Sequence, residues 1–292
     1  MKLVMYGEPF QEKPGVIVED NFILDLELEE LDSPHSVEEI LEFDLLEDIR
    51  ALLERPLPRE ALLPLGDVRL GPPLSGIGKV IACGLNYRDH ALESGSALPD
   101  VPLLFAKAPS AIAGPFDDLM LPPQSWSSAV DYEVELGVVI GHLCHEVSVE
   151  NALAYVAGYA IVNDVTARDI QKAESQWFRA KSYDGFCPLG PYLVTADEVE
   201  EPGNLQLSTR VNRTVRQQSN TSNLIFSVAE LVSFISQSMT LFPGDIIATG
   251  TPSGIGAGMK PPVFLQPGDE VELQVEGLGA QRYKVVEYSV SK

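Results

Sequence analysis

The stretch AVDYEVELGVVIG, residues 129–141, begins as an alternation of polar and apolar residues and ends as an apolar run. This pattern predicts a strand that enters the core of the protein. Asp131, Glu133 and Glu135 lie two residues apart, so in an extended chain their side chains leave the same face of the strand. The solvated face of an antiparallel strand would carry such a row as readily as a binding site would. Other segments of the chain are needed to distinguish a solvated strand face from a binding site.

The apolar end of this strand favours burial, and a second apolar run, residues 160–169, brings another carboxylate, Asp164. A buried carboxylate costs too much free energy unless it is paired with a cation or bound to a metal. Carboxylates from two strand ends, with no His or Cys near them in the sequence, suit a hard cation with oxygen ligands. Glu133, Glu135 and Asp164 are therefore the candidate ligands of Mg²⁺, with Mn²⁺ a close second.

The charge of the chain argues against some classes of partner. Its 292 residues include 20 Lys and Arg against 43 Asp and Glu, which gives a net charge of −23. Nucleic acids and anionic membranes are disfavoured as partners because phosphate binding needs clustered cations. A small anionic substrate is compatible with this charge if a bound metal or a few Lys and Arg reverse its sign locally.

The sequence predicts a cytoplasmic protein. The three cysteines are widely spaced and form neither a metal motif nor a disulfide framework. The first residues lack a signal-peptide pattern, and no apolar run approaches the roughly 18 residues that span a bilayer. We therefore expect a reducing compartment and no membrane partner.

Composition divides the chain near Gly71. Residues 1–70 read as a small N-terminal α+β domain of short strand-like runs and one helical segment. The Gly- and Pro-rich segment 69–79 reads as a linker. Residues 71–292 read as a mostly β domain, and their strands do not alternate with helices as they would in a doubly wound parallel sheet.

Three segments are predicted to be helical, two of them with a Ser and a Glu placed as a capping box at the N-terminus. They are residues 36–55, with Ser36 and Glu39; residues 148–158; and residues 227–239, with Ser227 and Glu230.

A possible catalytic pair follows the strand that is expected near residue 80. His90 and Glu93 are three residues apart in YRDHALESG, so on a helix they would face the same side. A carboxylate that orients an imidazole makes it a better general base. Taken by itself, a surface turn with ordinary polar residues explains this segment more simply.

Four further residues are candidates for substrate binding, and each has an ordinary structural alternative. Arg168 and Gln171 are one turn apart after Asp164, where they could also be the solvated start of a helix. Lys181 lies between aromatic and Gly/Pro-rich segments, where it could stabilise a developing negative charge or lie along the surface. Thr251 is in the segment ATGTPSGIG, which allows close approach of a ligand or simply forms a turn.

Taken together, six segments resemble the fumarylacetoacetate hydrolase superfamily, in its acylpyruvase, oxaloacetate decarboxylase and diketo-sugar-acid hydrolase branch. They occur in the order of that family and extend over residues 78–277. The segments are CGLNYRDHALESG, PLLFAKAPSAIAGP, DYEVELGVVIG, GYAIVNDVTARDIQ, WFRAKSYDGFCPLGPYLVT and MTLFPGDIIATGTPSGIG.

The resemblance implies a mixed β-roll, usually dimeric, with a divalent metal in the roll. It also assigns roles to the candidate residues, and it leaves Asp131 outside the metal site. These roles are metal ligands for Glu133, Glu135 and Asp164; a catalytic dyad for His90 and Glu93; substrate contact and oxyanion stabilisation for Lys181, Arg168 and Gln171; and carboxylate binding for Thr251.

One position departs from the family. Fumarylacetoacetate hydrolase proper has a fourth metal-binding Asp seven residues before its catalytic His, and this chain has Cys83 there. The departure disfavours fumarylacetoacetate itself as the substrate.

The function expected from this resemblance is that of a metal-dependent hydrolase. It would cleave a C–C bond of a 2,4-diketo acid, acylpyruvate-like or a diketo-deoxy sugar acid, to a carboxylic acid and a pyruvate-type product. The alternatives are an oxaloacetate decarboxylase, or a lyase or isomerase of a 2-oxo-ene dicarboxylate or ureidoglycolate. A non-catalytic binder of a 2-oxo acid and a purely structural protein are the remaining interpretations. A homodimer is expected.

Overall fold

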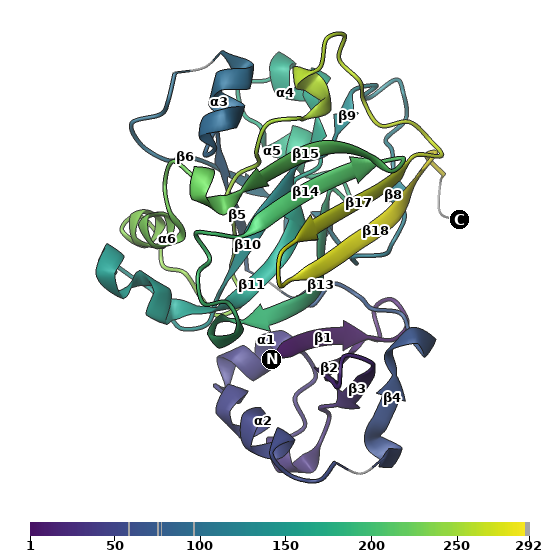
Figure 1. Cartoon of the computed structure of the whole chain (residues 1–292), viewed down its shortest axis with the longest axis vertical. Coiled ribbons are helices and arrows are strands. Elements are labelled where there is room, and N and C mark those ends of the chain that lie inside the picture. The colour runs from purple at the N-terminus through teal and green to yellow at the C-terminus, as the bar shows by residue number, and fades with distance from the viewer. Residues whose placement is uncertain (58, 75, 77, 96, 290–292) are drawn as a thin grey trace.

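The computed structural model describes residues 1–57, 59–74, 76, 78–95 and 97–289. Its strands form a large mixed sheet and a smaller sheet that lies against it, as Figure 1 shows. The order of the 11-stranded sheet is β4-β3-β2-β1-β13-β11-β10-β16-β5-β6, and β7 pairs with β13. Its strands are β1 (Lys2–Tyr6), β2 (Lys13–Val18), β3 (Phe22–Asp25), β4 (Leu62–Pro64), β5 (Val80–Gly84), β6 (Leu103–Lys107), β7 (Ile112–Ala113), β10 (Val134–Ile140), β11 (Val156–Asn163), β13 (Cys187–Thr195) and β16 (Ile246–Ala248).

The second sheet has five strands in the order β15-β14-β17-β18-β8, and a separate pair is formed by β12 and β9. Most neighbouring strands are antiparallel, while β16 with β5, β13 with β7 and β18 with β8 are parallel. The bounds are β8 (Leu119–Met120), β9 (Val130–Asp131), β12 (Thr166–Ala167), β14 (Gln206–Val211), β15 (Thr214–Asn220), β17 (Glu270–Val275) and β18 (Gly279–Val286).

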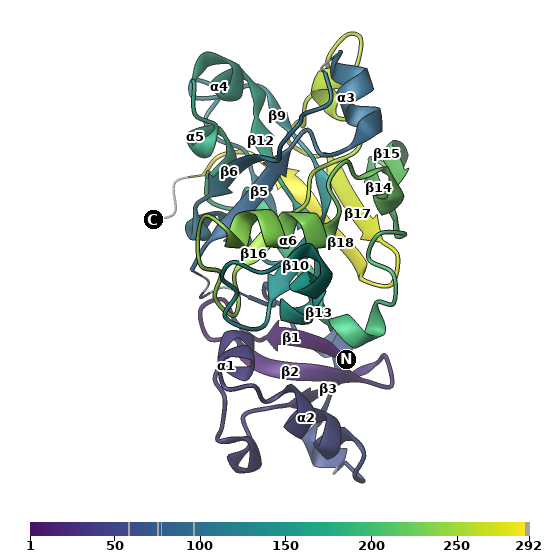
Figure 2. The same cartoon turned by 90° about the vertical axis from the view of Figure 1, so that its left-hand side faces the viewer.

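The helices are short and lie around the sheets. Figure 2 shows α6 across the larger sheet, and α3, α4 and α5 at the end of the molecule opposite to the N-terminal segment. Among the described residues, every helix is too short or too polar to span a membrane. The α-helices are α1 (Val37–Glu42), α2 (Leu46–Leu53), α3 (Arg88–Ser94), α4 (Arg168–Ala173), α5 (Phe178–Lys181) and α6 (Val228–Ser236), and two of the 3₁₀ helices are η5 (Val149–Tyr155) and η8 (Gly256–Gly258).

Strand β10, which the opening stretch predicted, lies in the middle of the fold and is buried along its whole length. Val134, Leu136 and Val138 pack into the core between the two sheets, together with residues of β17 and β18. Val139 points to the opposite face and packs with residues of the N-terminal segment. Both faces of β10 are therefore covered, which explains why its apolar run is continuous.

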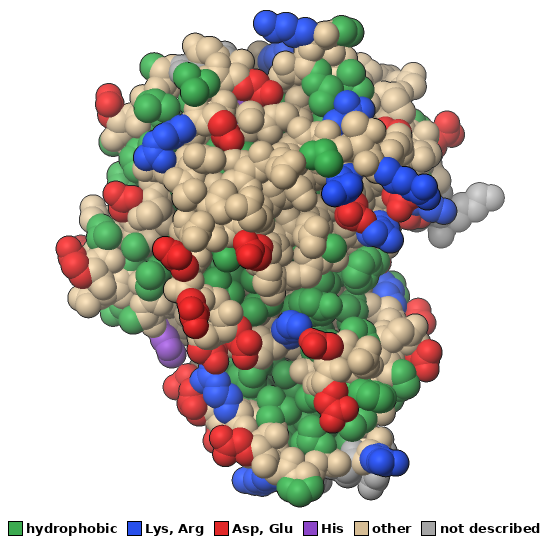
Figure 3. Space-filling model, in the orientation of Figure 1, with side chains coloured by type: hydrophobic (Ala, Val, Ile, Leu, Met, Phe, Trp, Pro, Cys, Tyr) green, Lys and Arg blue, Asp and Glu red, His purple; other side chains and the backbone are tan. Residues whose placement is uncertain are grey.

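The N-terminal segment adds its strands to the larger sheet. Strand β1 pairs antiparallel with β13, with Leu3 opposite Leu193. In the space-filling view of Figure 3, hydrophobic side chains gather where this segment meets the rest of the chain, and acidic side chains are spread over the face. The expected linker, residues 69–79, includes residues 75 and 77, which lie outside the described part of the chain. The division into two domains near residue 70 stays a prediction.

Residues 36–55 form two helices, so the prediction of a single helix there is wrong. The chain leaves α1 after Glu42 and turns at Asp44, which has a φ of 56°. The turn lets both halves bury their apolar residues, including Ile40 and Ile49, in one core. The capping box is also incomplete, since the Ser36 hydroxyl accepts the Glu39 N–H whereas the Glu39 carboxylate accepts the N–H of His35.

The other two helical segments differ in outcome. Within residues 148–158 the chain forms the 3₁₀ helix η5 over Val149–Tyr155, and Val156 already belongs to strand β11. Helix α6 is confirmed, and both hydrogen bonds of its capping box, between Ser227 and Glu230, are present.

Candidate active site

The acidic row, by which we mean Glu133, Glu135 and Asp164, lies where β10 begins and β11 ends. Val134 is paired with Asn163 in the antiparallel register of these strands, and beyond this pair the Asp164 N–H still donates to the Glu133 carbonyl. Glu133 precedes β10, Glu135 is its second residue and Asp164 follows β11, so strand pairing brings them together. One carboxylate oxygen from each lies within 4.8 Å of the others, and all three residues are buried.

Three cations contact two of these carboxylates. Lys181 Nζ donates to Glu133 Oε2 at 2.6 Å and to Asp164 Oδ2 at 2.5 Å. Arg168 Nη2 donates to Glu133 Oε1 at 2.5 Å, and Lys107 Nζ donates to Asp164 Oδ1 at 2.7 Å. Burial alone would raise the pKa of Glu133, but the charges of Arg168 and Lys181 hold it well below its usual range.

Glu135 has no such partner. Its carboxylate accepts the Gly250 N–H at 2.7 Å, and among the described residues no Lys or Arg forms an ion pair with it. Burial raises the pKa of Glu135 well above its usual range, and the neighbouring charges of Asp164 and Glu133 raise it further. The site therefore lacks positive charge at Glu135, and its oxygen donors fit a hard divalent cation.

His90 and Glu93 lie on α3, which ends at Gly95 in the left-handed conformation. His90 Nδ1 is 3.4 Å from Glu93 Oε2, and the other oxygen of Glu93 accepts the Gly254 N–H at 3.0 Å. The hydroxyl of Ser219, on β15, donates to the Asp89 carboxylate and so joins α3 to the smaller sheet. His90 can therefore act as a general base that the Glu93 carboxylate orients. The distance between the two side chains is long for a hydrogen bond.

The structure brings all of the predicted site residues to the lining of one cavity of about 560 Å³. Its wall also contains apolar side chains, such as Phe105 and Trp177, and two exposed cations, Lys172 and Lys260. The predicted residues in the lining are His90, Glu93, Glu133, Glu135, Asp164, Arg168, Gln171, Lys181 and Thr251. Their individual roles stay predictions.

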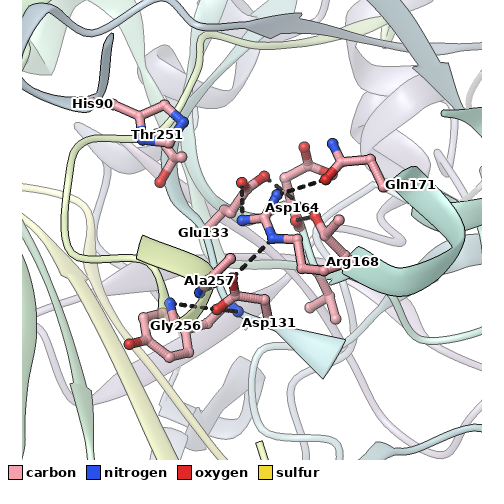
Figure 4. Close-up of polar contacts among 12 residues, drawn as sticks. His90, Asp131, Glu133, Asp164, Arg168, Gln171, Thr251, Gly256 and Ala257 are labelled. Atoms are coloured by element: carbon pink, nitrogen blue, oxygen red, sulfur yellow. Dashed lines mark hydrogen bonds and ion pairs between the residues drawn. The ribbon is translucent and has the colours of Figure 1, made fainter. Parts of the chain in front are cut away.

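Two of these residues form more hydrogen bonds within the protein than the sequence suggested. Arg168 is buried and contacts Asp131, Glu133 and Gln171, as Figure 4 shows. Thr251 donates its hydroxyl to the Val134 carbonyl at 3.0 Å and accepts a hydrogen bond from Gln217. Both side chains therefore support the acidic row in addition to lining the cavity.

Sequence reasoning missed Lys107. It is the last residue of β6, its side chain is fully buried, and it also donates to the Val165 carbonyl at 3.3 Å. The one local signal is a Lys within an apolar strand, in the segment LLFAK. A buried Lys almost always has an acidic partner, but nothing in that segment indicates that the partner is Asp164.

Comparisons with known proteins show the family to which the chain belongs. Residues 79–286 match the family model described as fumarylacetoacetate (FAA) hydrolase C-terminal. The chain is 46% identical over 292 residues to a 2,4-didehydro-3-deoxy-L-rhamnonate hydrolase of Sphingomonas sp. (strain SKA58), a match that covers 99% of this chain and 97% of that protein. It is 43% identical over 293 residues to the mitochondrial oxaloacetate tautomerase FAHD2A of Bos taurus, covering 98% of this chain and 92% of that protein.

A solved structure gives the corresponding likeness in three dimensions. Maleylpyruvate hydrolase from Sphingobium sp. SYK-6, solved in complex with a manganese(II) ion and pyruvate, has 31% sequence identity and a TM-score of 0.81. The match covers 99% of this chain and 100% of that chain. The family resemblance and the mostly β fold class that the sequence predicted are both confirmed.

Proposed function

The chain is an enzyme of the fumarylacetoacetate hydrolase family, and from this premise we propose that it is a metal-dependent hydrolase of 2,4-diketo acids. One observation carries the proposal. Glu133, Glu135 and Asp164 converge within 4.8 Å in the cavity that also holds the pair His90 and Glu93. A cation site beside a potential general base is the arrangement that hydrolysis of an activated carbonyl needs.

The three carboxylates would hold Mg²⁺ or Mn²⁺. Glu135 supports this assignment because its buried carboxylate has no cationic partner among the described residues. The manganese(II) ion in the structure of the related maleylpyruvate hydrolase supports it as well. A bound divalent ion would draw electron density from the 2-oxo group of the substrate and so stabilise the enolate product.

His90 would be the general base. Its ring nitrogen would accept a proton from water, whose oxygen then adds to the distal carbonyl of the substrate. Glu93 would hold the ring in place and stabilise its positive charge, over a contact of 3.4 Å. Hydrogen bonds of this kind often tighten when substrate binds.

Lys181, Arg168 and Gln171 would complete the site. The addition places a negative charge on the distal carbonyl oxygen, which Lys181 and Gln171 would stabilise from the cavity wall. The C–C bond then breaks, giving a carboxylic acid and the enolate of a pyruvate-type product, which takes up a proton. Together with a bound divalent ion, Lys181 and Arg168 would reverse the sign of the local charge, so that a chain with a net charge of −23 could bind an anion here.

The substrate class follows from the relatives. The named activity of the Sphingomonas relative supports a diketo-deoxy sugar acid. Shorter acylpyruvates are the substrates that the resemblance to the acylpyruvase branch implies. We further infer a homodimer, which the family resemblance implies, and a cytoplasmic location. Light scattering after size-exclusion chromatography would test the dimer.

A second candidate is a reaction of oxaloacetate, either decarboxylation or tautomerisation. The identity of 43% to the bovine oxaloacetate tautomerase favours it. Both reactions need enolate stabilisation, as hydrolysis does, but neither needs a water that attacks carbon.

Product analysis distinguishes the two candidates. The purified enzyme with Mg²⁺ or Mn²⁺ is incubated with acetylpyruvate or with oxaloacetate, and the products are followed by proton NMR. Formation of pyruvate and acetate from acetylpyruvate supports the hydrolase. If the enzyme turned over oxaloacetate but not acetylpyruvate, the second candidate would replace the hydrolase.

A further inference from the structure

Asp131 was expected to lie outside the metal site, and the proposed mechanism gives it no role. The structure shows that its carboxylate is fully buried and accepts hydrogen bonds on both oxygens. Oδ2 accepts from Arg168 Nε at 2.8 Å and from the Ala257 N–H at 3.0 Å. Oδ1 accepts from the Gly256 N–H at 2.7 Å and from its neighbour, the Tyr132 N–H, at 3.0 Å. A buried carboxylate with this many donors is held in one position.

On one side, Asp131 fixes the Arg168 side chain. Figure 4 shows the guanidinium between two carboxylates, with Nε donating to Asp131 and Nη2 donating to Glu133 at 2.5 Å. Since the guanidinium is planar and rigid, the position of one carboxylate constrains the position of the other. Asp131 thus acts on Glu133 through Arg168.

On the other side, Asp131 fixes the turn of residues 254–258. A Cβ at Gly256 would come within 2.7 Å of Asp131 Oδ1 and 2.1 Å of the Val263 carbonyl oxygen, so the chain can approach this closely only as glycine. The same turn contacts the proposed base pair, since the Gly254 N–H donates to Glu93 at 3.0 Å. A Cβ at Gly258 would also meet the Glu93 carboxylate, at 2.6 Å.

We propose that Asp131 is a positioning residue that holds Glu133, through Arg168, and Glu93, through the turn 254–258, in a fixed relation to each other. The inference rests on the proposed function, in which Glu133 holds the metal and Glu93 orients the base. Asp131 does not contact the substrate in this account. It sets the distance between the metal ligands and the base from behind the cavity wall.

Asparagine cannot replace Asp131 in this arrangement. Its amide has one acceptor oxygen, so its NH₂ group would face two N–H donors in either orientation. These donors are Arg168 Nε–H and the Ala257 N–H in one orientation, and the Gly256 and Tyr132 N–H groups in the other. Asp131→Asn therefore loses either the contacts to Arg168 and Ala257 or the contact to Gly256, although the volume of the side chain is almost unchanged. The loss of the negative charge also weakens its hold on Arg168.

The test measures Mn²⁺ binding and backbone exchange in the whole protein. Apo-protein is titrated with Mn²⁺ while the EPR signal of the free ion is recorded, and hydrogen exchange of peptides that cover 254–258 is followed by mass spectrometry. We expect Asp131→Asn to weaken Mn²⁺ binding about tenfold or more and to speed exchange in the turn. A folded variant with a Kd for Mn²⁺ within twofold of the wild type overturns the proposal.

Asp245→Asn is the matched control. Asp245 is also fully buried and accepts backbone N–H groups, of Lys79 and Phe242, but it lies outside the cavity lining. Its variant should lose stability and keep the wild-type affinity for Mn²⁺. If both variants weakened Mn²⁺ binding equally, the effect would be a general loss of stability and the proposal would fail.

Two further outcomes remain decisive. If Asp131→Asn does not fold, Arg168→Lys takes its place in the test. Lysine keeps the charge but cannot donate to both carboxylates in the same geometry. Unchanged Mn²⁺ affinity in that variant overturns the proposal.

A wild-type protein that binds no Mn²⁺ or Mg²⁺ counts against the proposed function. Hydrogen exchange at residues 254–258 then tests the positioning role of Asp131 without reference to a metal. Unchanged exchange in Asp131→Asn overturns that role.

Discussion

Lys107 Nζ lies 2.7 Å from Asp164 Oδ1, and both side chains are fully buried. Without Lys107, Asp164 would keep only Lys181, which it shares with Glu133, and breaking a buried ion pair typically costs about 3 kcal/mol or more. We expect Lys107→Met to lower the free energy of unfolding by about that amount, as measured by urea denaturation. Lys172→Met, at an exposed position, should change it by less than about 0.5 kcal/mol. Equal effects of the two substitutions would show that the pair contributes nothing.

Glu135 is the carboxylate without a cation, so its replacement should separate stability from function. Glu135→Gln removes a buried charge and keeps an oxygen that can accept the Gly250 N–H. We expect the variant in EDTA to be more stable than the wild type, by about 1 kcal/mol or more. Mn²⁺ should not stabilise this variant. The free energy of unfolding of the wild type should rise by about 2.7 kcal/mol when Mn²⁺ is present at 100 times its Kd. Thermal unfolding with EDTA and with Mn²⁺ measures both effects. A variant that Mn²⁺ still stabilises as much as the wild type would remove Glu135 from the metal ligands.

His90 can be tested separately from the metal. His90→Ala should bind Mn²⁺ with the wild-type affinity, because the proposed ligands are unchanged, and its kcat for hydrolysis should fall by about 10² to 10⁴. His145→Ala, at an exposed position outside the cavity lining, is the control and should keep full activity. Hydrolysis by His90→Ala at the wild-type rate would show that the base is another group.

Lys172 and Lys260 are exposed residues of the cavity lining, and neither forms an ion pair among the described residues. A positive charge at this place should favour substrates whose distal group is anionic. We expect the double substitution Lys172→Ser and Lys260→Ser to lower kcat/KM for a dianionic 2-oxo acid about tenfold more than for a neutral acylpyruvate, and most strongly at low salt.

The control for this prediction is Lys284→Ser, an exposed residue of β18 outside the cavity lining. It should lower kcat/KM for the two substrates equally, if at all. A double variant with unchanged preference would assign selection of the distal group to the apolar part of the wall, near Phe105 and Trp177.

The acidic row was predictable because its geometry is local. Alternate residues of a strand share a face, which places Glu133 and Glu135 together, and the apolar runs of β10 and β11 mark neighbouring buried strands. The capping box of α6 was predictable for the same reason, since Ser227 and Glu230 contact each other within one turn. In both cases the interacting residues are close in the sequence or lie on elements that pair directly.

The remaining features depend on contacts between distant parts of the chain. Lys107 meets Asp164 across 57 positions, and Asp131 meets Gly256 across 125. Such pairs are set by strand order and packing, which no short segment encodes. The break at Asp44 is a case in which tertiary packing overrides a helical pattern, since Ile40 and Ile49, on the two sides of the break, pack in one core.

The most direct test of the account is the loss of the enol absorbance of acetylpyruvate, recorded with Mn²⁺ or Mg²⁺, then with excess EDTA, and again after metal is restored. The account predicts rapid loss with metal, none in EDTA, and recovery on restoring the metal, with Glu135→Gln inactive throughout. Rapid loss that persists in EDTA would contradict it, because Glu133, Glu135 and Asp164 would then not form a metal site that the reaction requires.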